Sequence, residues 1–390
     1  VPGIDHREQI NRMFRFIQYI ERQVVLFDAI EDSLFNKIGR TDDSGSLQSM
    51  LQLAGQSDAT RSAISEKLEK FSLRLVLTAH PTQFYPGTVL GIITDLIEAL
   101  KVNDLNNIDL LLQQLGKTPF FNKTSPTPVD EAASLVWFLE NTFYHAVAGI
   151  QARLEEEFDI DYSGNHQILE LGFWPGGDRD GNPNVTTETT AAVANLLRQI
   201  IFRCYYRDFR VLKRRITFRG VEKTMSRLEK LLYHNAFATP QNPKDLQGEL
   251  LSLLNSVRQT LVTDHDELFI DIVDHLIQKI KLFGCYFATL DIRQDSRILR
   301  NVFKYCTQQS QIKSGLKGYD ALSEAEKLKA IPFNEADFHC PDDEEDMTKD
   351  TLNTIRLVKQ IQQSNGEKAC QRFIISNCQR ASDILELVNL

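Results

Sequence analysis

The stretch LELGFWPGGDRDGNP, residues 169–183, decides how the rest of the sequence is interpreted. It begins as a short apolar run and then changes abruptly into glycine, proline and charged residues. Two other runs share this layout, LRLVLTAHPTQ from Leu73 and YFATLDIRQDS from Tyr286, and a fourth run, RFIISN, begins at Arg372. Short apolar runs that stop at turn residues are typical of buried strands. The sequence therefore predicts four strands, three of which end in a polar cluster.

Long helical patterns fill the sequence between these runs. From Ala132 to Leu154, apolar residues recur with a period near 3.6, and Thr127 and Pro128 are suited to the N-cap and the first helical position. Similar periodicity predicts further helices over residues 9–35, 187–209, 246–261, 268–283 and 351–361. Parallel strands need long crossovers, which helices supply. We expect a mainly α fold with a partial parallel β-barrel: an incomplete TIM-like (β/α) barrel of about four of eight strands, with large helical insertions.

Composition excludes several classes of function. The net charge of -9 over 390 residues gives no overall basic field that would attract nucleic acid or an anionic membrane. Every apolar run is far shorter than the roughly 20 residues of a membrane-spanning helix. The six cysteines form no CxxC pair and have no zinc-finger spacing, which favours reduced thiols over a metal site. We expect a soluble, cytoplasmic protein with no nucleic-acid or membrane partner and no metal ligands in this sequence.

The first polar cluster contains His80. Because Pro81 follows it, the backbone at His80 is restricted to an extended conformation that projects the imidazole from the strand end. A histidine in this position can act as an acid, a base or an electrostatic stabiliser near neutral pH. The alternative is a histidine that only ties a turn through hydrogen bonds.

The second cluster is the glycine-rich loop that follows the run from Leu169. Its glycines, Gly176 and Gly177 among them, permit unusual backbone angles and close approach to a ligand. Asp178, Arg179 and Asp180 place both signs of charge in the same loop. Such a loop can bind an anion, orient a catalytic group, or simply hold itself together by internal ion pairs.

The third cluster places Arg293 beside the strand end. Strand alternation puts Asp291 and Arg293 on one face and Ile292 on the other. The planar guanidinium suits bidentate recognition of phosphate or carboxylate. The alternative is an internal salt bridge from Arg293 to Asp291 or Asp295.

Taken together, TAHPTQ, GGDRDGNP with its preceding G-x-W, and DIRQ followed by an acid and serine resemble the motifs of the phosphoenolpyruvate carboxylase family. The resemblance runs from about Leu73 to the C-terminus and includes PTPVDEA from Pro126. It implies anaplerotic carbon fixation: carboxylation of phosphoenolpyruvate by bicarbonate to oxaloacetate and phosphate, with Mg²⁺ or Mn²⁺. It also implies a homotetrameric whole protein that supplies the tricarboxylic acid cycle.

The resemblance also implies roles for individual residues. His80 would be the catalytic histidine that assists carboxyphosphate breakdown, and Arg293 would hold the substrate phosphate. The loop containing Gly176, Gly177 and Asp178 would close over the substrate and hold Arg179 and Asp180 near bicarbonate. The paired arginines usual in the family are replaced by Pro86 and Gly87, which makes activation by sugar phosphates doubtful.

The resemblance leaves part of the family's machinery unaccounted for. Its metal-binding carboxylates and catalytic lysine belong to a later half, so we expect a piece of a longer protein that is inactive alone. We expect an N-terminal helical region over residues 1–70 and the first half of a barrel over residues 71–390, truncated before the metal-binding half. Two alternatives stay open: a noncatalytic anion-binding or regulatory helical half, and an enzyme acting on another phospho-enol or keto acid.

Overall fold

The computed structural model describes residues 5–38, 46–78, 85–120, 126–158, 167–180, 182–238, 245–308, 318–331 and 346–390. Within these ranges the chain is mainly helical and contains five short strands. No helix of the described ranges is both long and apolar enough to cross a membrane. The chain divides into two compact units: unit 1 is residues 1–64 and 80–126, and unit 2 is residues 65–79 and 127–390.

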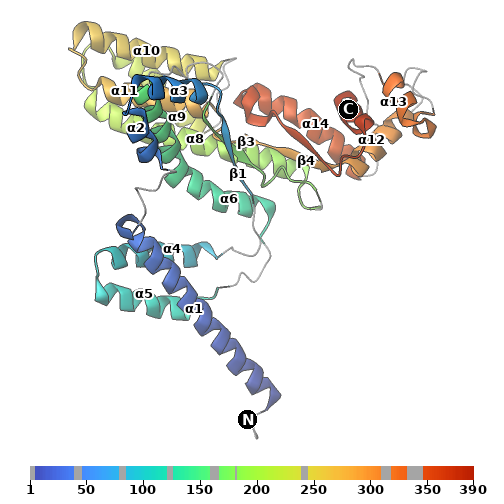
Figure 1. The fold of residues 1–390 in the computed structure, drawn as a ribbon, viewed down its shortest axis with the longest axis horizontal. Coiled ribbons are helices and arrows are strands. Elements are labelled where there is room, and N and C mark those ends of the chain that lie inside the picture. The colour runs from blue at the N-terminus through green and yellow to red at the C-terminus, as the bar shows by residue number, and fades with distance from the viewer. Residues whose placement is uncertain are drawn as a thin grey trace. The chain divides into compact units, whose positions relative to one another are not determined.

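Unit 1 is built on α1 (His6–Ile38), α4 (Gly87–Lys101) and α5 (Leu105–Lys117), which lie side by side in Figure 1. Their shared core includes Val25, Leu96 and Leu115. The shorter α2 (Leu47–Ala54) precedes α3 (Asp58–Leu68), where the first stretch of unit 1 ends. The N-terminal helical region expected over residues 1–70 thus differs from unit 1, because α4 and α5 bury their apolar faces against α1.

The long helix expected around residues 132–154 is present but interrupted. It consists of α6 (Pro128–Phe138), a π-helical turn η1 (Leu139–Phe143) and α7 (Tyr144–Phe158). Its predicted start is confirmed, since the Thr127 hydroxyl accepts from the Asp130 N–H at 3.2 Å and the Asp130 carboxylate accepts from the Thr127 N–H at 2.9 Å. This reciprocal capping box satisfies donors that the first helical turn leaves unpaired.

Helices also make up most of the rest of unit 2 (Figure 1). The predicted helices at residues 187–209, 246–261, 268–283 and 351–361 are confirmed, and most extend somewhat further. The helical elements of this part are α8 (Thr187–Arg215), α9 (Glu222–Phe237), α10 (Leu246–Asp264), α11 (Ile270–Phe283), α12 (Ser296–Gln308), η3 (Tyr319–Ala321), α13 (Glu324–Ala330), α14 (Asp346–Asn365), η4 (Glu367–Cys370) and α15 (Ala381–Asn389).

All four predicted strand runs form strands, and every pairing between them is parallel. Asp291 divides the third run into two strands. The first described sheet has the order β1-β2-β3 and the second pairs β4 with β5. The described strands thus form two small parallel sheets and no closed barrel. Their bounds are β1 (Leu73–Leu77), β2 (Leu169–Phe173), β3 (Thr289–Leu290), β4 (Ile292–Asp295) and β5 (Phe373–Ser376).

Strand alternation separates an apolar face from a polar one. Leu171, Phe173 and Ile292 belong to the large core that the strands share with residues of α8 and α11. Full burial of such side chains stabilises a fold by about 1.5–3 kcal/mol each. The intervening positions carry charged residues, including Arg74 and Glu170. The Arg74 Nε lies 3.9 Å from the Glu170 Oε2. The helices therefore cover one face of the strands, and the charges lie on the other.

Candidate functional site

The glycine-rich loop leaves the carboxyl end of β2 and joins two neighbouring strands. The Trp174 N–H donates to the carbonyl oxygen of Leu77, the last residue of β1, at 3.0 Å. Further along, the Arg179 N–H donates to the Arg293 carbonyl and the Arg293 N–H donates to the Gly177 carbonyl, both at 2.9 Å. The loop thus continues the parallel pairing past β2. The second and third polar clusters of the sequence meet at this edge, as expected for parallel strands.

Two glycines allow the loop to run this close to its neighbours. Gly176 has φ +79°, and a Cβ there would lie 2.5 Å from a methyl carbon of Val193. A Cβ on Gly177 would lie 2.0 Å from the carbonyl oxygen of Asp291. Side chains at either position would collide with the protein, so glycine is required for packing. The close approaches that the structure describes at Gly176 and Gly177 are to protein atoms.

The side chain of Arg293 lies between two carboxylates of the loop. Its Nη1 is 3.0 Å from Asp178 Oδ2 and its Nη2 is 2.7 Å from Asp180 Oδ2. The guanidinium carbon also lies 5.3 Å from the centroid of the Trp174 ring, which is a cation–π distance. About 28 % of the Arg293 side chain stays exposed. Arg293, Asp178 and Asp180 therefore form a compact charged group that solvent reaches.

The alternative salt bridges considered for Arg293 are not the ones observed. Asp291 is fully buried and accepts two hydrogen bonds of 2.7 Å from Arg74, on β1. Asp295 is paired instead with Arg297, whose Nη2 lies 2.6 Å from its Oδ2. An internal ion pair does hold Arg293, but the carboxylates come from the loop and not from its own strand.

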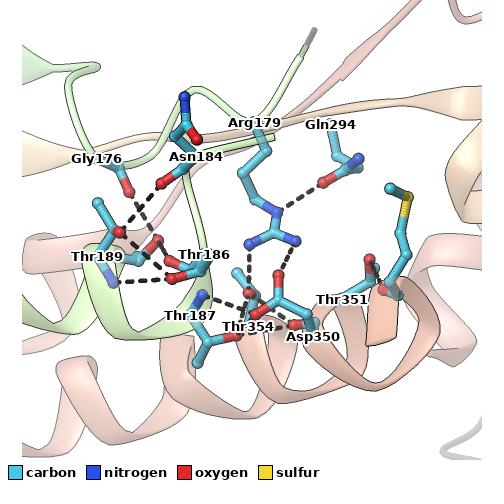
Figure 2. Close-up of polar contacts among 12 residues, drawn as sticks. Gly176, Arg179, Asn184, Thr186, Thr187, Thr189, Gln294, Asp350, Thr351 and Thr354 are labelled. Atoms are coloured by element: carbon cyan, nitrogen blue, oxygen red, sulfur yellow. Dashed lines mark hydrogen bonds and ion pairs between the residues drawn. The ribbon is translucent and has the colours of Figure 1, made fainter. Parts of the chain in front are cut away.

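Arg179 is almost completely buried. Figure 2 shows its guanidinium pointing toward Gln294, Asp350 and Thr354. Its Nε donates to Gln294 Oε1 at 2.8 Å, its Nη1 donates to Thr354 Oγ1 at 2.9 Å, and its Nη2 is ion-paired with Asp350. The same Asp350 carboxylate accepts from the N–H of Thr187, the first residue of α8, at 2.9 Å. We call these five residues the Arg179 clamp. The clamp joins the loop to the start of α8 and to α14.

The charge of Asp350 is stabilised inside this clamp. Burial by itself would raise the pKa of Asp350, but the hydrogen bonds from Thr187 and Arg179 outweigh it and leave the pKa lowered. An acidic residue at the first turn of α8 also complements the positive end of that helix dipole. The clamp is therefore a charged group in which each guanidinium nitrogen of Arg179 has a polar partner.

The sequence hypothesis placed His80, Arg179 and Arg293 around one opening. His80 lies outside the described residues. Asp178 pairs with Arg293 in the extended backbone, and the next residue, Arg179, contacts Gln294. Because successive side chains of extended backbone point to opposite faces, Arg179 and Arg293 lie on opposite faces of the strands. A cavity of about 470 Å³ borders Arg179, Gln294 and Asp350 on the clamp side.

Some residues of the site were not predicted from the sequence. Arg74 could have been recognised from the sequence, because it is the one charged residue within the apolar run LRLVL. Nothing in the sequence pointed to Asp350 or Thr354 as partners of Arg179, since they follow it by more than 170 residues. No group of three or more histidine, cysteine or acidic side chains that could hold a metal ion occurs in the described ranges.

Comparison with known proteins gives a consistent result. A family model described as phosphoenolpyruvate carboxylase matches residues 11–232 and 216–390. A protein of Aeromonas salmonicida strain A449 named phosphoenolpyruvate carboxylase is 26 % identical over 386 residues, which cover 87 % of this chain and 43 % of that relative. Relatives of the same name occur in Pectobacterium carotovorum subsp. carotovorum strain PC1 (27 % over 390 residues; 86 % and 43 %) and Prochlorococcus marinus strain MIT 9312 (24 % over 411; 84 % and 41 %). The chain spans about two fifths of the length of these relatives.

Proposed function

This chain belongs to the phosphoenolpyruvate carboxylase family, and on that premise we propose that the whole protein carboxylates phosphoenolpyruvate with bicarbonate. The products are oxaloacetate and phosphate, an anaplerotic fixation of carbon that supplies the tricarboxylic acid cycle. The observation that carries the proposal is the seating of the GGDRD loop against Arg293, just beyond the carboxyl ends of β2 and β3. Parallel strands present active-site groups at that edge.

Two chemical steps are proposed. Bicarbonate oxygen attacks the phosphorus of phosphoenolpyruvate, so that carboxyphosphate forms and the pyruvate enolate leaves. Carboxyphosphate then releases CO₂ and phosphate, and the enolate carbon attacks CO₂ to form oxaloacetate. Both steps develop negative charge in a small space, so fixed cations are the groups that the chain must supply.

We propose that Arg293 holds the phosphate of phosphoenolpyruvate. Its guanidinium is planar, partly exposed and supported by the Trp174 ring, which suits bidentate contact with phosphate oxygens. Asp178 and Asp180 occupy the same guanidinium nitrogens in this structure. Because a phosphate and two carboxylates repel each other, substrate binding requires the loop carboxylates to turn away from Arg293. Gly176 and Gly177 lie in this loop directly before Asp178 and contribute to substrate binding through the loop backbone.

The roles of Arg179 and Asp180 in the proposal are different from each other. Asp180 lies on the Arg293 side and has 23 % of its side chain exposed, which supports a place near bicarbonate. Arg179 has each of its three guanidinium nitrogens engaged by Gln294, Thr354 or Asp350. These contacts support a role of Arg179 in fixing the loop that carries Asp180. Its contribution to catalysis is then to the geometry of the loop.

His80 is proposed to assist carboxyphosphate breakdown and to keep protons from the enolate. In the sequence it is the third residue after Leu77, the last residue of β1. His80→Asn removes the titratable imidazole and keeps a polar side chain of similar reach. In the whole protein we expect it to abolish oxaloacetate formation while phosphoenolpyruvate still binds. Full oxaloacetate production by the variant would refute this role.

The remaining parts of the proposal concern the whole protein. Mg²⁺ or Mn²⁺ would be held by residues outside this chain. The strand order, in which each parallel run lies beside the next, supports the first four strands of an eight-stranded barrel. Without the other strands and the metal ligands, this chain alone should form no oxaloacetate. Cys204, Cys285, Cys370 and Cys378 form no disulfide, which supports a reducing, cytoplasmic location, and the assembly is proposed to be a homotetramer.

One experiment separates this proposal from its competitors. An anion-binding regulatory half would bind phosphoenolpyruvate without turnover, and the partly exposed guanidinium of Arg293 is the group that such a half would use. An enzyme for another phospho-enol or keto acid would turn over without bicarbonate. We expect the whole protein to form oxaloacetate only when phosphoenolpyruvate, bicarbonate and Mg²⁺ are all present. Turnover that does not depend on bicarbonate would reject the carboxylase proposal.

A further inference from the structure

A buried salt bridge crosses three strands beside the candidate substrate site. Arg74, on β1, donates through Nη1 and Nη2 to the two carboxylate oxygens of Asp291, each at 2.7 Å. Asp291 is fully buried between β3 and β4, and only 17 % of the Arg74 side chain is exposed. Such a two-pronged contact fixes the rotation of a carboxylate, which a single hydrogen bond does not.

The contact depends on a glycine of the intervening strand. Gly172, on β2, is paired with Val76 on one side and Thr289 on the other. A Cβ at Gly172 would lie 2.8 Å from Cζ and from Nη2 of Arg74. The guanidinium therefore passes over β2 at the place where that strand has no side chain.

The carboxylate of Asp291, whose rotation Arg74 fixes, also binds the side chain of Trp174. The indole Nε1–H of Trp174 donates to Asp291 Oδ2 at 3.0 Å. Trp174 also contacts Arg293 through its ring. The ring centroid lies 5.3 Å from the guanidinium carbon of Arg293, which is a cation–π distance. An aromatic ring that is held by its N–H is a fixed platform for a cation.

We propose that Arg74 is a positioning residue: through Asp291 and Trp174, its two-pronged contact sets the orientation of Arg293 toward the substrate phosphate. The inference rests on the proposed function, in which Arg293 holds that phosphate. A simpler role for Arg74 would be to neutralise the buried charge of Asp291. An Arg74→Lys substitution distinguishes the two roles. Lysine still neutralises Asp291, but it lacks the planar guanidinium that makes the two-pronged contact.

The first test follows Trp174 by fluorescence in this chain and needs no turnover. The sequence contains two tryptophans, so Trp137→Phe leaves Trp174 as the sole emitter. In that background, Arg74→Lys should shift the emission maximum and increase acrylamide quenching, because the indole N–H loses its fixed acceptor. Arg227→Lys is the matched control, since Arg227 also contacts a single carboxylate, Glu249, through Nε and Nη2. Identical spectra for Arg74→Lys and the control would overturn the proposal.

The second test measures steady-state kinetics in the whole protein. Arg74→Lys should raise KM for phosphoenolpyruvate by about tenfold and change kcat much less, since it disturbs an orienting contact and leaves Arg293 in place. Arg227→Lys should leave both constants unchanged. If Trp174 emission shifts but KM does not, the positioning role is wrong while the carboxylase proposal stands. If Arg293→Met also leaves KM unchanged, the substrate role of Arg293 itself is wrong.

A double-mutant cycle identifies the route of the effect. Trp174→Phe keeps an aromatic platform under Arg293 and removes only the N–H donor to Asp291. If Arg74 acts through Trp174, the double variant should have nearly the KM of either single variant. Multiplicative effects on KM would show separate routes and overturn the inference. Trp174→Phe by itself provides the same KM test should Arg74→Lys fail to fold.

Discussion

Arg179 and Arg293 stand at neighbouring positions of paired backbone, and their surroundings differ sharply. Arg179 is 8 % exposed and contacts α14 and Gln294, whereas the Arg293 side chain is 28 % exposed and contacts its own loop. Two partners of Arg179, Asp350 and Thr354, come from the distant helix α14, whereas the carboxylates that pair with Arg293 belong to the glycine-rich loop. One face of this edge is thus tied to a distant helix through a buried clamp, and the other carries charges that solvent can reach.

The largest loss of stability is expected from Arg179→Met. Removing one partner of a buried ion pair leaves the charge of Asp350 uncompensated, which typically costs about 3–5 kcal/mol. Both tryptophans belong to unit 2, so urea unfolding followed by tryptophan fluorescence measures the relevant unit. Arg227→Met removes an exposed ion pair of the same kind and should cost less than about 1 kcal/mol. Equal losses of unfolding free energy for Arg179→Met and Arg227→Met would show that the buried clamp contributes no more to stability than an exposed ion pair.

A smaller loss is expected from Gly177→Ala. The added Cβ would lie 2.0 Å from the Asp291 carbonyl oxygen, so the loop must shift away from β4. Overpacking of this kind typically costs about 1–3 kcal/mol. Gly149→Ala is the matched control in the same unit, because nothing lies within 4 Å of the corresponding Cβ in α7. A Gly177→Ala variant as stable as the wild type would show that the loop is not held where the structure places it.

Arg293→Met should change stability least among the substitutions and substrate affinity most. Its ion pairs are partly exposed, so unfolding should change by about 1 kcal/mol or less. Loss of charged hydrogen bonds to a phosphate, about 1.5–3 kcal/mol, corresponds to a KM increase of about 10- to 100-fold in the whole protein. Urea unfolding and initial-rate kinetics on the same preparation check both parts. A large loss of stability with unchanged KM would reverse the assignment of the two faces.

The smallest effect is a pH dependence that originates in the clamp. Because the folded-state pKa of Asp350 is lowered, its contribution to stability is present above the unfolded pKa, near 3.9, and is lost as pH falls through the folded value. Asp350→Asn should therefore flatten the decline of the urea midpoint between about pH 5 and pH 3. Arg179→Met should flatten it as well, since Arg179 helps to lower that pKa. If the urea midpoint of both variants falls with pH as steeply as that of the wild type, Asp350 does not contribute to the loss of stability in acid.

Local sequence patterns predicted most of the elements but fewer of the contacts. The helix start at Thr127 and the strands at Leu73, Leu169 and Phe373 follow from capping residues and apolar periodicity, which act over a few residues. The π-helical turn at Leu139 was not predicted, because one extra residue in a turn leaves no clear change in the apolar pattern. The alternative considered for Arg293, an ion pair with Asp291 or Asp295, named carboxylates of its own strand, whereas the observed partners are Asp178 and Asp180 of the loop.

The sequence by itself determined the order of strands and helices, the glycine-rich loop and its resemblance to one enzyme family. Only the tertiary structure decided that Arg179 enters the clamp with Asp350 and that Arg293 lies on the opposite face with Asp178 and Asp180. The physical reason is one of range. Periodicity and capping act between near neighbours in the chain, whereas an ion pair depends on which distant backbone happens to run alongside and on which face each side chain then points.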